Sequence, residues 1–460
     1  MQPEHLIFGG GANETHLHPL VAMWMFIAIV LILVLRRDRA IIPFFLAFFT
    51  IPLAQVIVVG PLHFPVLRIL ILAGLARMVL PLGAGSGGKF PGGFNGLDRV
   101  VVLWTVSALV IISLQWMELT AFIKFVGDFL DSLGGYFVVR FLIPDRVAVR
   151  RTVKALALIC LIQGACMTSE LFTHQNVFGF LGANHPTIRD GHLRAEGTLG
   201  TLYGGTFAGV SVPLFLWLWT EEKSRIKACV GIIGATSMAF ASHASTSWMA
   251  YAAGLLGLCF WPLRKQMRLL RWGLVGTLVG LHLVMHGPVW SLIEKVDVTG
   301  GSSSYHRYML VDNCIRHFGD WWLLGYRNYG NWGFDMWDLC NQFVAVALTG
   351  GLITLILFVA IYGKSFQAIG RARKEVEGNR AQEWFLWCLG STLFANVVAS
   401  FGINYMIQLE LALFPLLACI CLAAFPARQS VLREVNSVKD LLSASAPGAA
   451  ENFLRVRGAR

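Results

Sequence analysis

The side chains best suited to chemistry gather in one polar stretch, residues 300–351, of an otherwise very apolar chain. Arginines there can bind anionic oxygens through paired hydrogen bonds, and aspartates or histidines can accept a proton. The stretch carries Arg307, Arg316, Arg327, His306, His317, Asp312, Asp320, Asp335 and Asp338. Because apolar segments precede and follow it, we expect any reaction to take place at a lipid–water boundary.

The composition of the chain predicts a membrane protein. Of the 460 residues, 56% are hydrophobic and 14% are charged, whereas a soluble protein carries about 25% charged residues. Apolar runs of about 20 residues, separated by short basic loops, predict an all-α, polytopic bundle of about 12 or 13 transmembrane helices. The net charge of +11 lies mostly in alternate loops, so we interpret it as a membrane-orientation signal and expect no nucleic-acid partner.

The chain divides into one membrane-embedded domain, expected over residues 1–425, and a flexible cytoplasmic tail, expected over residues 426–460. The tail is polar and rich in Ser and Ala, which is typical of a segment that cannot bury a core. The expected spans are residues 19–35, 40–60, 62–82, 99–116, 120–142, 155–173, 201–219, 228–243, 246–262, 272–287, 342–362, 384–402 and 405–425.

Basic loops orient this bundle, because Lys and Arg favour the cytoplasmic side of a membrane. With these loops in the cytoplasm, residues 174–200 and one large loop, 288–341, face the extracytoplasmic side. The basic loops are residues 36–39, 146–154, 223–227, 264–271 and 364–380.

Charged residues also occur inside the expected spans. Arg68 lies in span 62–82, where a charge is costly, so we expect it either to reach the membrane surface or to face a substrate cavity. Lys124 and Asp128 are four residues apart on one helix face and can form an ion pair.

Two further polar segments are expected on the same side as loop 288–341. The first, Arg194-Ala-Glu-Gly-Thr-Leu-Gly200, leads into a span rich in small residues, which allow close approach of a helix or a ligand. The second, Ser-His-Ala-Ser-Thr-Ser-Trp at residues 242–248, either lines the same cavity or simply completes a helix–helix turn.

The nine cysteines show no CxxC pair and no Cys/His spacing typical of a metal site. Only Cys314 and Cys340 lie in the polar stretch. In an oxidising compartment they either form a disulfide or lie too far apart to do so.

Three short stretches, in this order, resemble the bacterial O-antigen polymerase and O-antigen ligase family of membrane glycosyltransferases. The first is the Arg194–Gly200 segment, which resembles the family's Arg-x-x-Gly-Thr-x-Gly. The second runs from Tyr305-His306-Arg307 to Trp322-Leu-Leu-Gly325. The third is Asp338-Leu-Cys-Asn341, followed by Gly350-Gly351-Leu352.

The resemblance implies transfer of a glycan from a polyprenyl (undecaprenyl) diphosphate donor to a glycan or lipid-linked acceptor, without metal or cofactor. Arginines would neutralise the leaving pyrophosphate, and a base would take the proton of the acceptor hydroxyl. The catalytic residues would be Arg307, Asp338 and His306. The substrate-binding residues would be Arg194, Arg316, Asn341, Arg68 and His317.

The resemblance places the protein in a bacterial inner membrane, with its active site outside the cytoplasm and with other polysaccharide-assembly proteins as possible partners. Ligases of the family have a histidine where Cys340 stands, and Trp248 replaces their arginine after Ser247, so a polymerase is favoured over a ligase. A lipid-linked oligosaccharide or sugar transporter is the alternative from another class. The concentration of polar groups outside the spans favours the enzyme.

Overall fold

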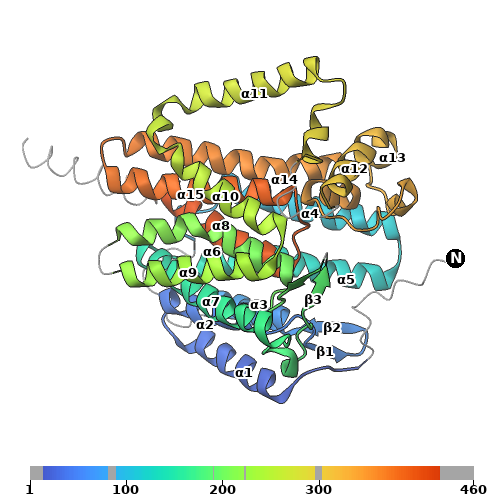
Figure 1. Ribbon diagram of the computed structural model, residues 1–460. Coiled ribbons are helices and arrows are strands. Elements are labelled where there is room, and N and C mark those ends of the chain that lie inside the picture. Colours follow the sequence, from blue (N-terminus) through green and yellow to red (C-terminus); the bar gives the residue numbers. More distant parts are fainter. Residues whose placement is uncertain (1–13, 81–89, 190, 222–223, 296–302, 425–460) are drawn as a thin grey trace, which may run out of the picture.

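The computed structural model describes residues 14–80, 90–189, 191–221, 224–295 and 303–424, so the expected tail 426–460 lies outside the described residues. The protein is mainly helical (Figure 1). Five of its helical segments are long and apolar enough to cross a membrane: α4 (Gly96–Trp116), α7 (Arg146–Thr173), α8 (Thr201–Thr220), η3–α11 (Trp261–Val284) and α14 (Gln342–Glu375). The coarse prediction of a helical membrane protein therefore agrees with the fold.

The other expected spans are also mostly helical, but their helices do not combine the length and apolar character of the five. Apolar helices α1 (Pro19–Val34) and α16 (Ile407–Ala424) lie at either end of the described chain. The expected span 120–142 is continuous but changes its hydrogen bonding at a π-helical turn, η1 (Leu130–Gly134). The remaining members are α2 (Arg37–Thr50), α3 (Val66–Val79), α5 (Leu119–Phe129), α6 (Gly135–Leu142), α9 (Arg225–Ser242), α10 (Ser245–Cys259) and α15 (Arg380–Ser400).

Two β-hairpins interrupt the helices. β1 (Val56–Val59) pairs with β2 (Leu62–Pro65), and β3 (Thr187–Arg189) pairs with β4 (His192–Arg194). The expected spans 40–60 and 62–82 are therefore wrong in their extent. The run Val-Ile-Val-Val is β-branched, and Gly60, with φ of 60°, makes the turn, so the chain forms a hairpin there instead of continuing a helix.

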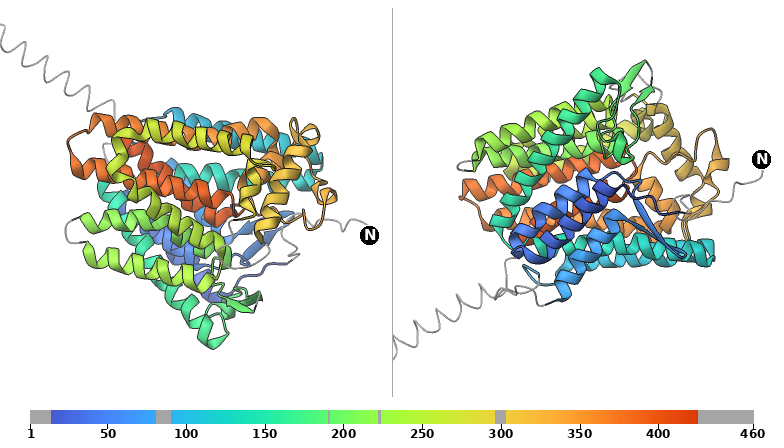
Figure 2. Two further views of the ribbon diagram at one scale, coloured as in Figure 1. Left: turned by 45° about the horizontal axis from the view of Figure 1, so that its top comes forward. Right: turned by 90° about the horizontal axis from the view of Figure 1, so that it is seen from below.

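The basic loops meet at one end of the bundle. Arg151 pairs with Asp38, Arg150 pairs with Glu221, and Arg264 Nε lies 3.0 Å from Glu383 Oε2. Hairpin β3–β4 and the helices α12 (Ser303–Arg316) and α13 (Phe318–Trp321) lie at the opposite end (Figures 1 and 2). Segments 174–200 and 303–341 thus share one end of the molecule, as the charge pattern predicts.

The segment expected as a large loop, 288–341, is mostly folded over its described residues, 288–295 and 303–341. These parts contain η4 (Val289–Ile293), α12, α13 and η5 (Tyr329–Trp332). Cys314 and Trp321 pack with Val344, Ala347 and Leu348 in a small core that joins the segment to α14. Cys314 and Cys340 are free thiols, so the alternative of a disulfide between them is wrong.

Helix α14 is kinked at Gly351, which has φ of 67°. The turn after α13 forms backbone hydrogen bonds with α14 at this kink. Leu352 N donates to Trp322 O (2.8 Å), and Tyr326 N donates to Leu348 O (2.7 Å). A Cβ on Gly351 would lie 2.6 Å from Leu323 O. The break in the helix therefore fixes the folded segment to the bundle.

Helices α7, α8 and α9 make the closest contacts of the bundle. A Cβ on Gly164 of α7 would lie 2.6 Å from Gly234 O of α9, so the two backbones touch there. Helix α11 differs from these three helices. It stands apart from the bundle (Figure 1), and none of its residues is buried.

Candidate functional site

Arg307 is the centre of the candidate site. It lies on α12 with only 6% of its surface exposed. Its Nη2 donates to Thr246 Oγ1 at 3.0 Å, and the Thr246 hydroxyl donates to Gly402 O at 3.0 Å. The guanidinium is therefore held against the start of α10 and the segment before α16, although these elements are far apart in sequence.

His306, Asp338 and Cys340 lie beside Arg307. The carbonyl oxygen of Asp338 accepts from Cys340 N (2.9 Å) and lies 2.8 Å from His306 Nε2. Burial and the nearby Asp338 carboxylate raise the pKa of the Cys340 thiol to about 11, against the opposing effect of Arg307. Cys340 is therefore protonated at neutral pH, which makes it a poor nucleophile.

Asn341 performs a structural role at the start of α14. It is 1% exposed, and its Oδ1 accepts from Phe343 N (3.0 Å) and Val344 N (3.2 Å). Asn341, and not Asp338, therefore caps this helix. Asp338 itself is exposed, so its carboxylate remains accessible from solvent.

The Arg194–Gly200 segment is held rigidly by buried acceptors. Glu170 of α7, which is fully buried, accepts from Glu196 N at 2.8 Å and from Gly197 N at 2.9 Å. Gly197 has φ of 57°, and a Cβ there would lie 2.7 Å from Gln163 Oε1, so only glycine fits. Glu170 and Gln163 thus set the position of Arg194.

Arg194 lies at the end of β4 and is half-buried. Its Nη2 donates to His243 O at 3.1 Å. The His243 ring stacks on His192 with centroids 5.3 Å apart, and burial, His192 and Arg194 together lower the pKa of His243. Arg194 and Arg307 therefore bind the same turn, residues 243–246, from two sides.

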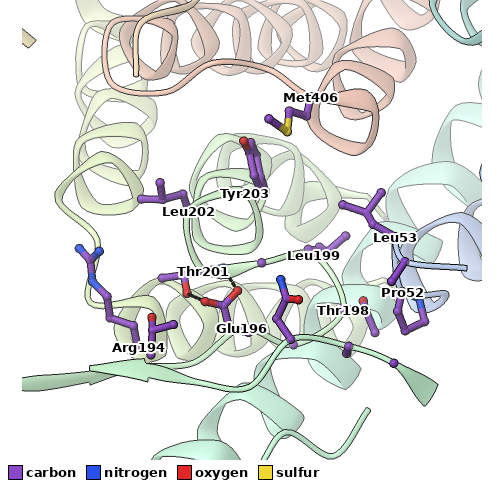
Figure 3. Close-up of a pocket in the computed structure, with 17 residues that line it drawn as sticks. Pro52, Leu53, Arg194, Glu196, Thr198, Leu199, Thr201, Leu202, Tyr203 and Met406 are labelled. Carbon is purple, nitrogen blue, oxygen red and sulfur yellow. Dashed lines mark hydrogen bonds between the residues drawn. The ribbon is translucent and has the colours of Figure 1, made fainter. Parts of the chain in front are cut away.

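A cavity of about 420 Å³ is lined by Arg194, whereas Arg307, Asp338 and the turn 243–246 lie outside its lining. Figure 3 shows Arg194 at one edge of it, Pro52 and Leu53 at the opposite edge, and Tyr203 and Met406 above. Glu196 faces the cavity and accepts from the Thr201 hydroxyl at 2.8 Å. The Asp338 carboxylate acts electrostatically on Tyr203, which lines the cavity.

The structure links Arg194 and Arg307 through the turn 243–246 and groups His306, Asp338 and Cys340 beside Arg307. Arg316 instead points away, because its side chain is 70% exposed and its Nε lies 2.6 Å from Asp312 Oδ2. Nine residues separate it from Arg307, so it lies on a different face of α12.

His317 and Arg68 also have other partners. His317 Nδ1 lies 3.1 Å from Asp320 Oδ2, and its ring stacks on Trp332. Arg68 is bidentate on Asp131, with Nη2 2.7 Å from Oδ2. The expected Lys124–Asp128 pair forms at 3.1 Å, and Asp128 Oδ1 also lies 3.5 Å from Arg68 Nη2.

Three residues of the site region, Tyr203, Met406 and Glu170, were not predicted from the sequence. Glu170 and Tyr203 lie within apolar runs, and Met406 carries no charge, so the sequence pattern did not indicate a functional role for them. Thr246 lies in the polar hairpin 242–248, for which the sequence left two alternatives. None of these residues lines the cavity, but the Thr246 hydroxyl accepts from Arg307.

The fold and this site define a helical membrane protein in which charged residues converge at one end of the bundle. Comparisons with protein-family models and with curated proteins found no match to the chain.

Proposed function

We propose that the chain is a membrane glycosyltransferase of the O-antigen polymerase/ligase type, acting on polyprenyl-diphosphate-linked glycans at the extracytoplasmic face of a bacterial inner membrane. One observation carries the proposal. Arg194 and Arg307 come from two motifs more than a hundred residues apart, both bind the turn 243–246, and Arg194 also lines the cavity.

The two arginines suit the leaving group. A pyrophosphate that departs from the donor gains negative charge, and guanidinium groups stabilise such charge most strongly where water is excluded. Arg307 is 6% exposed, and Arg194 borders the cavity. The cavity volume of about 420 Å³ lies in the range of small-molecule sites, so it would hold the reacting end of a donor and not a long chain.

Asp338 is the proposed base, because it is exposed, does not cap a helix and acts electrostatically on Tyr203, which lines the cavity. His306 is the second candidate, since its Nε2 lies 2.8 Å from the Asp338 carbonyl oxygen. Arg316, His317 and Arg68 are engaged elsewhere, so we assign them no role in transfer.

The test is an assay of the purified full-length chain in detergent with a polyprenyl-diphosphate-linked oligosaccharide, with products analysed by gel and mass spectrometry. Chain growth indicates a polymerase, and transfer to lipid A core or protein indicates a ligase. We expect chain growth, because Cys340 replaces the ligase histidine. Absence of every glycan product from a monodisperse sample would contradict the proposal.

A transporter is the second candidate, and one observation favours it. Arg68 is 11% exposed and pairs with Asp131 (5% exposed) at the π-helical turn of the α5–α6 helix, and buried charges of this kind often mark transport pathways. In proteoliposomes, a transporter would move lipid-linked oligosaccharide across the bilayer, and Asp131→Asn would abolish the movement. Glycan transfer with no such movement would exclude this candidate.

A further inference from the structure

His306, Asp338 and Cys340 form a cluster of possible metal ligands. One ligand atom from each side chain lies within 4.8 Å of the other two. Imidazole nitrogen, carboxylate oxygen and thiolate sulfur are the ligand types that Zn²⁺ uses, and three protein ligands with one open position are typical of an exchangeable zinc site. The spacing of cysteines in the sequence did not predict this cluster, because His306 comes from a distant helix.

The backbone holds the three residues in place without a metal. The Asp338 carbonyl oxygen accepts from Cys340 N (2.9 Å) and lies 2.8 Å from His306 Nε2. A metal-bound histidine commonly uses its other ring nitrogen for such a bond to a backbone carbonyl. Asn341, which caps α14, fixes the chain directly after Cys340.

The cluster needs only a small contraction to bind an ion. Metal–ligand bonds of about 2.0–2.3 Å in a tetrahedral site place ligand atoms about 3.3–3.8 Å apart. Atoms that now lie within 4.8 Å of one another can reach this spacing by side-chain rotation alone, since Asp338 is exposed and the other two are only partly buried.

We propose that His306, Asp338 and Cys340 bind Zn²⁺ reversibly, and that the bound ion inhibits glycan transfer. Arg307 interacts with Cys340, so its positive charge opposes the ion and keeps the affinity below that of a closed structural zinc site. The inhibition rests on the proposed function, because the ion would occupy the two candidate bases, Asp338 and His306. The binding of metal does not depend on that function.

The binding test uses Co²⁺, which replaces zinc and gives a thiolate-to-cobalt charge-transfer band when cysteine is a ligand. The purified full-length chain should show this band at one equivalent of Co²⁺ and lose it when Zn²⁺ is added. Cys340→Ser should remove the band. Cys314→Ala should keep it, because Cys314 lies in the small core with Trp321. No band in the unaltered chain, or a band that survives in Cys340→Ser, overturns the proposal.

The activity test uses the same samples. Zn²⁺ should inhibit transfer and a chelator should restore it, whereas Cys340→Ser should retain transfer but need at least about tenfold more Zn²⁺ for half-inhibition, as expected when one of three ligands is lost. Equal inhibition of both proteins would also overturn the proposal. Cobalt binding through Cys340 in a chain that transfers no glycan would leave the metal site standing and reject the transferase.

Discussion

At the scale of single residues, Arg307 and Arg316 are two candidate site arginines that differ in burial. Both lie on α12, and the sequence analysis assigned Arg307 a catalytic role and Arg316 a substrate-binding role. Arg307 is 6% exposed and bonded to Thr246, whereas the Arg316 side chain is 70% exposed and paired with Asp312. A charge in a partly dehydrated site acts more strongly on a ligand than a solvated one, so we assign the chemistry to Arg307.

Arg307→Ala should reduce the rate of glycan transfer by about 10²–10³, the usual cost of losing one well-aimed donor. Arg307→Lys should restore only part of the rate, because lysine keeps the positive charge but lacks the planar guanidinium group that donates paired hydrogen bonds. Arg316→Ala is the matched control on the same helix and should keep near-normal transfer. Transfer rates of purified proteins check this, and an equal loss in both alanine variants would contradict it.

Asp338→Asn should lower transfer by about 10²–10⁴ if the carboxylate is the base. The substitution leaves the cap of α14 intact, because Asn341 and not Asp338 provides it. A loss of rate would therefore report on chemistry and not on folding.

The measurement for Asp338 is the transfer rate of the purified variants beside their thermal unfolding midpoints. Asp338→Glu should be partly active. An Asp338→Asn protein with normal rate would reject this base, and His306 would become the next residue to replace.

At the scale of the elements, the kink of α14 connects the site to the bundle. The turn after α13 donates from Tyr326 N to Leu348 O, and Gln115 Nε2 of α4 donates to the same oxygen at 3.2 Å. The kink leaves the Leu348 carbonyl oxygen without its partner in the helix, and these two donors replace that partner. A backbone group inside an apolar environment needs such a hydrogen bond. The position of Asp338, before the same helix, depends on this arrangement.

Gly351→Ala should destabilise the protein by about 1–3 kcal/mol, because alanine is strained at φ of 67° and its Cβ would lie 2.6 Å from Leu323 O. Gly363→Ala, in the same helix, is the control, since its Cβ would meet nothing within 4 Å. It should be neutral or more stable by about 0.5–1 kcal/mol. Unfolding midpoints in detergent compare the two, and an equal effect at both sites would contradict the role of the kink.

At the scale of the whole molecule, the basic loops and the candidate site occupy opposite ends of the bundle. Pairs such as Arg151–Asp38 and Arg264–Glu383 join the basic loops at one end. Hairpin β3–β4 and helix α12, which carry Arg194 and Arg307, lie at the other end (Figures 1 and 2). From the positive-inside rule we propose that the site faces outward.

Cysteines introduced at Asn184 and Asn331 should react with a membrane-impermeant thiol reagent in intact cells, because both positions are exposed at the end that carries the site. Ala381→Cys, exposed at the start of α15, should react only after the cells are opened. All three belong in a Cys259→Ser background, since Cys259 is an exposed native thiol. Labelling of Ala381→Cys in intact cells, with protection of the other two, would reverse the orientation and reject an extracytoplasmic site.

The sequence by itself determined the helical membrane class, most helix positions and several local relations. Apolar runs of this length cannot form stable soluble loops, so they became helices wherever no turn interrupted them. A spacing of four residues correctly paired Lys124 with Asp128. These features depend on residues that are close to one another along the chain, so they can be predicted from the sequence.

Only the tertiary structure decided which polar groups meet. The bond from Arg307 to Thr246, the pairing of Arg68 with Asp131, and the carbonyl shared by His306 and Cys340 were absent from the pattern. Each depends on packing between segments distant in sequence, whereas periodicity reports only on one helix face at a time. A buried polar group binds whichever partner the fold brings within reach, and that choice is made by the assembled bundle.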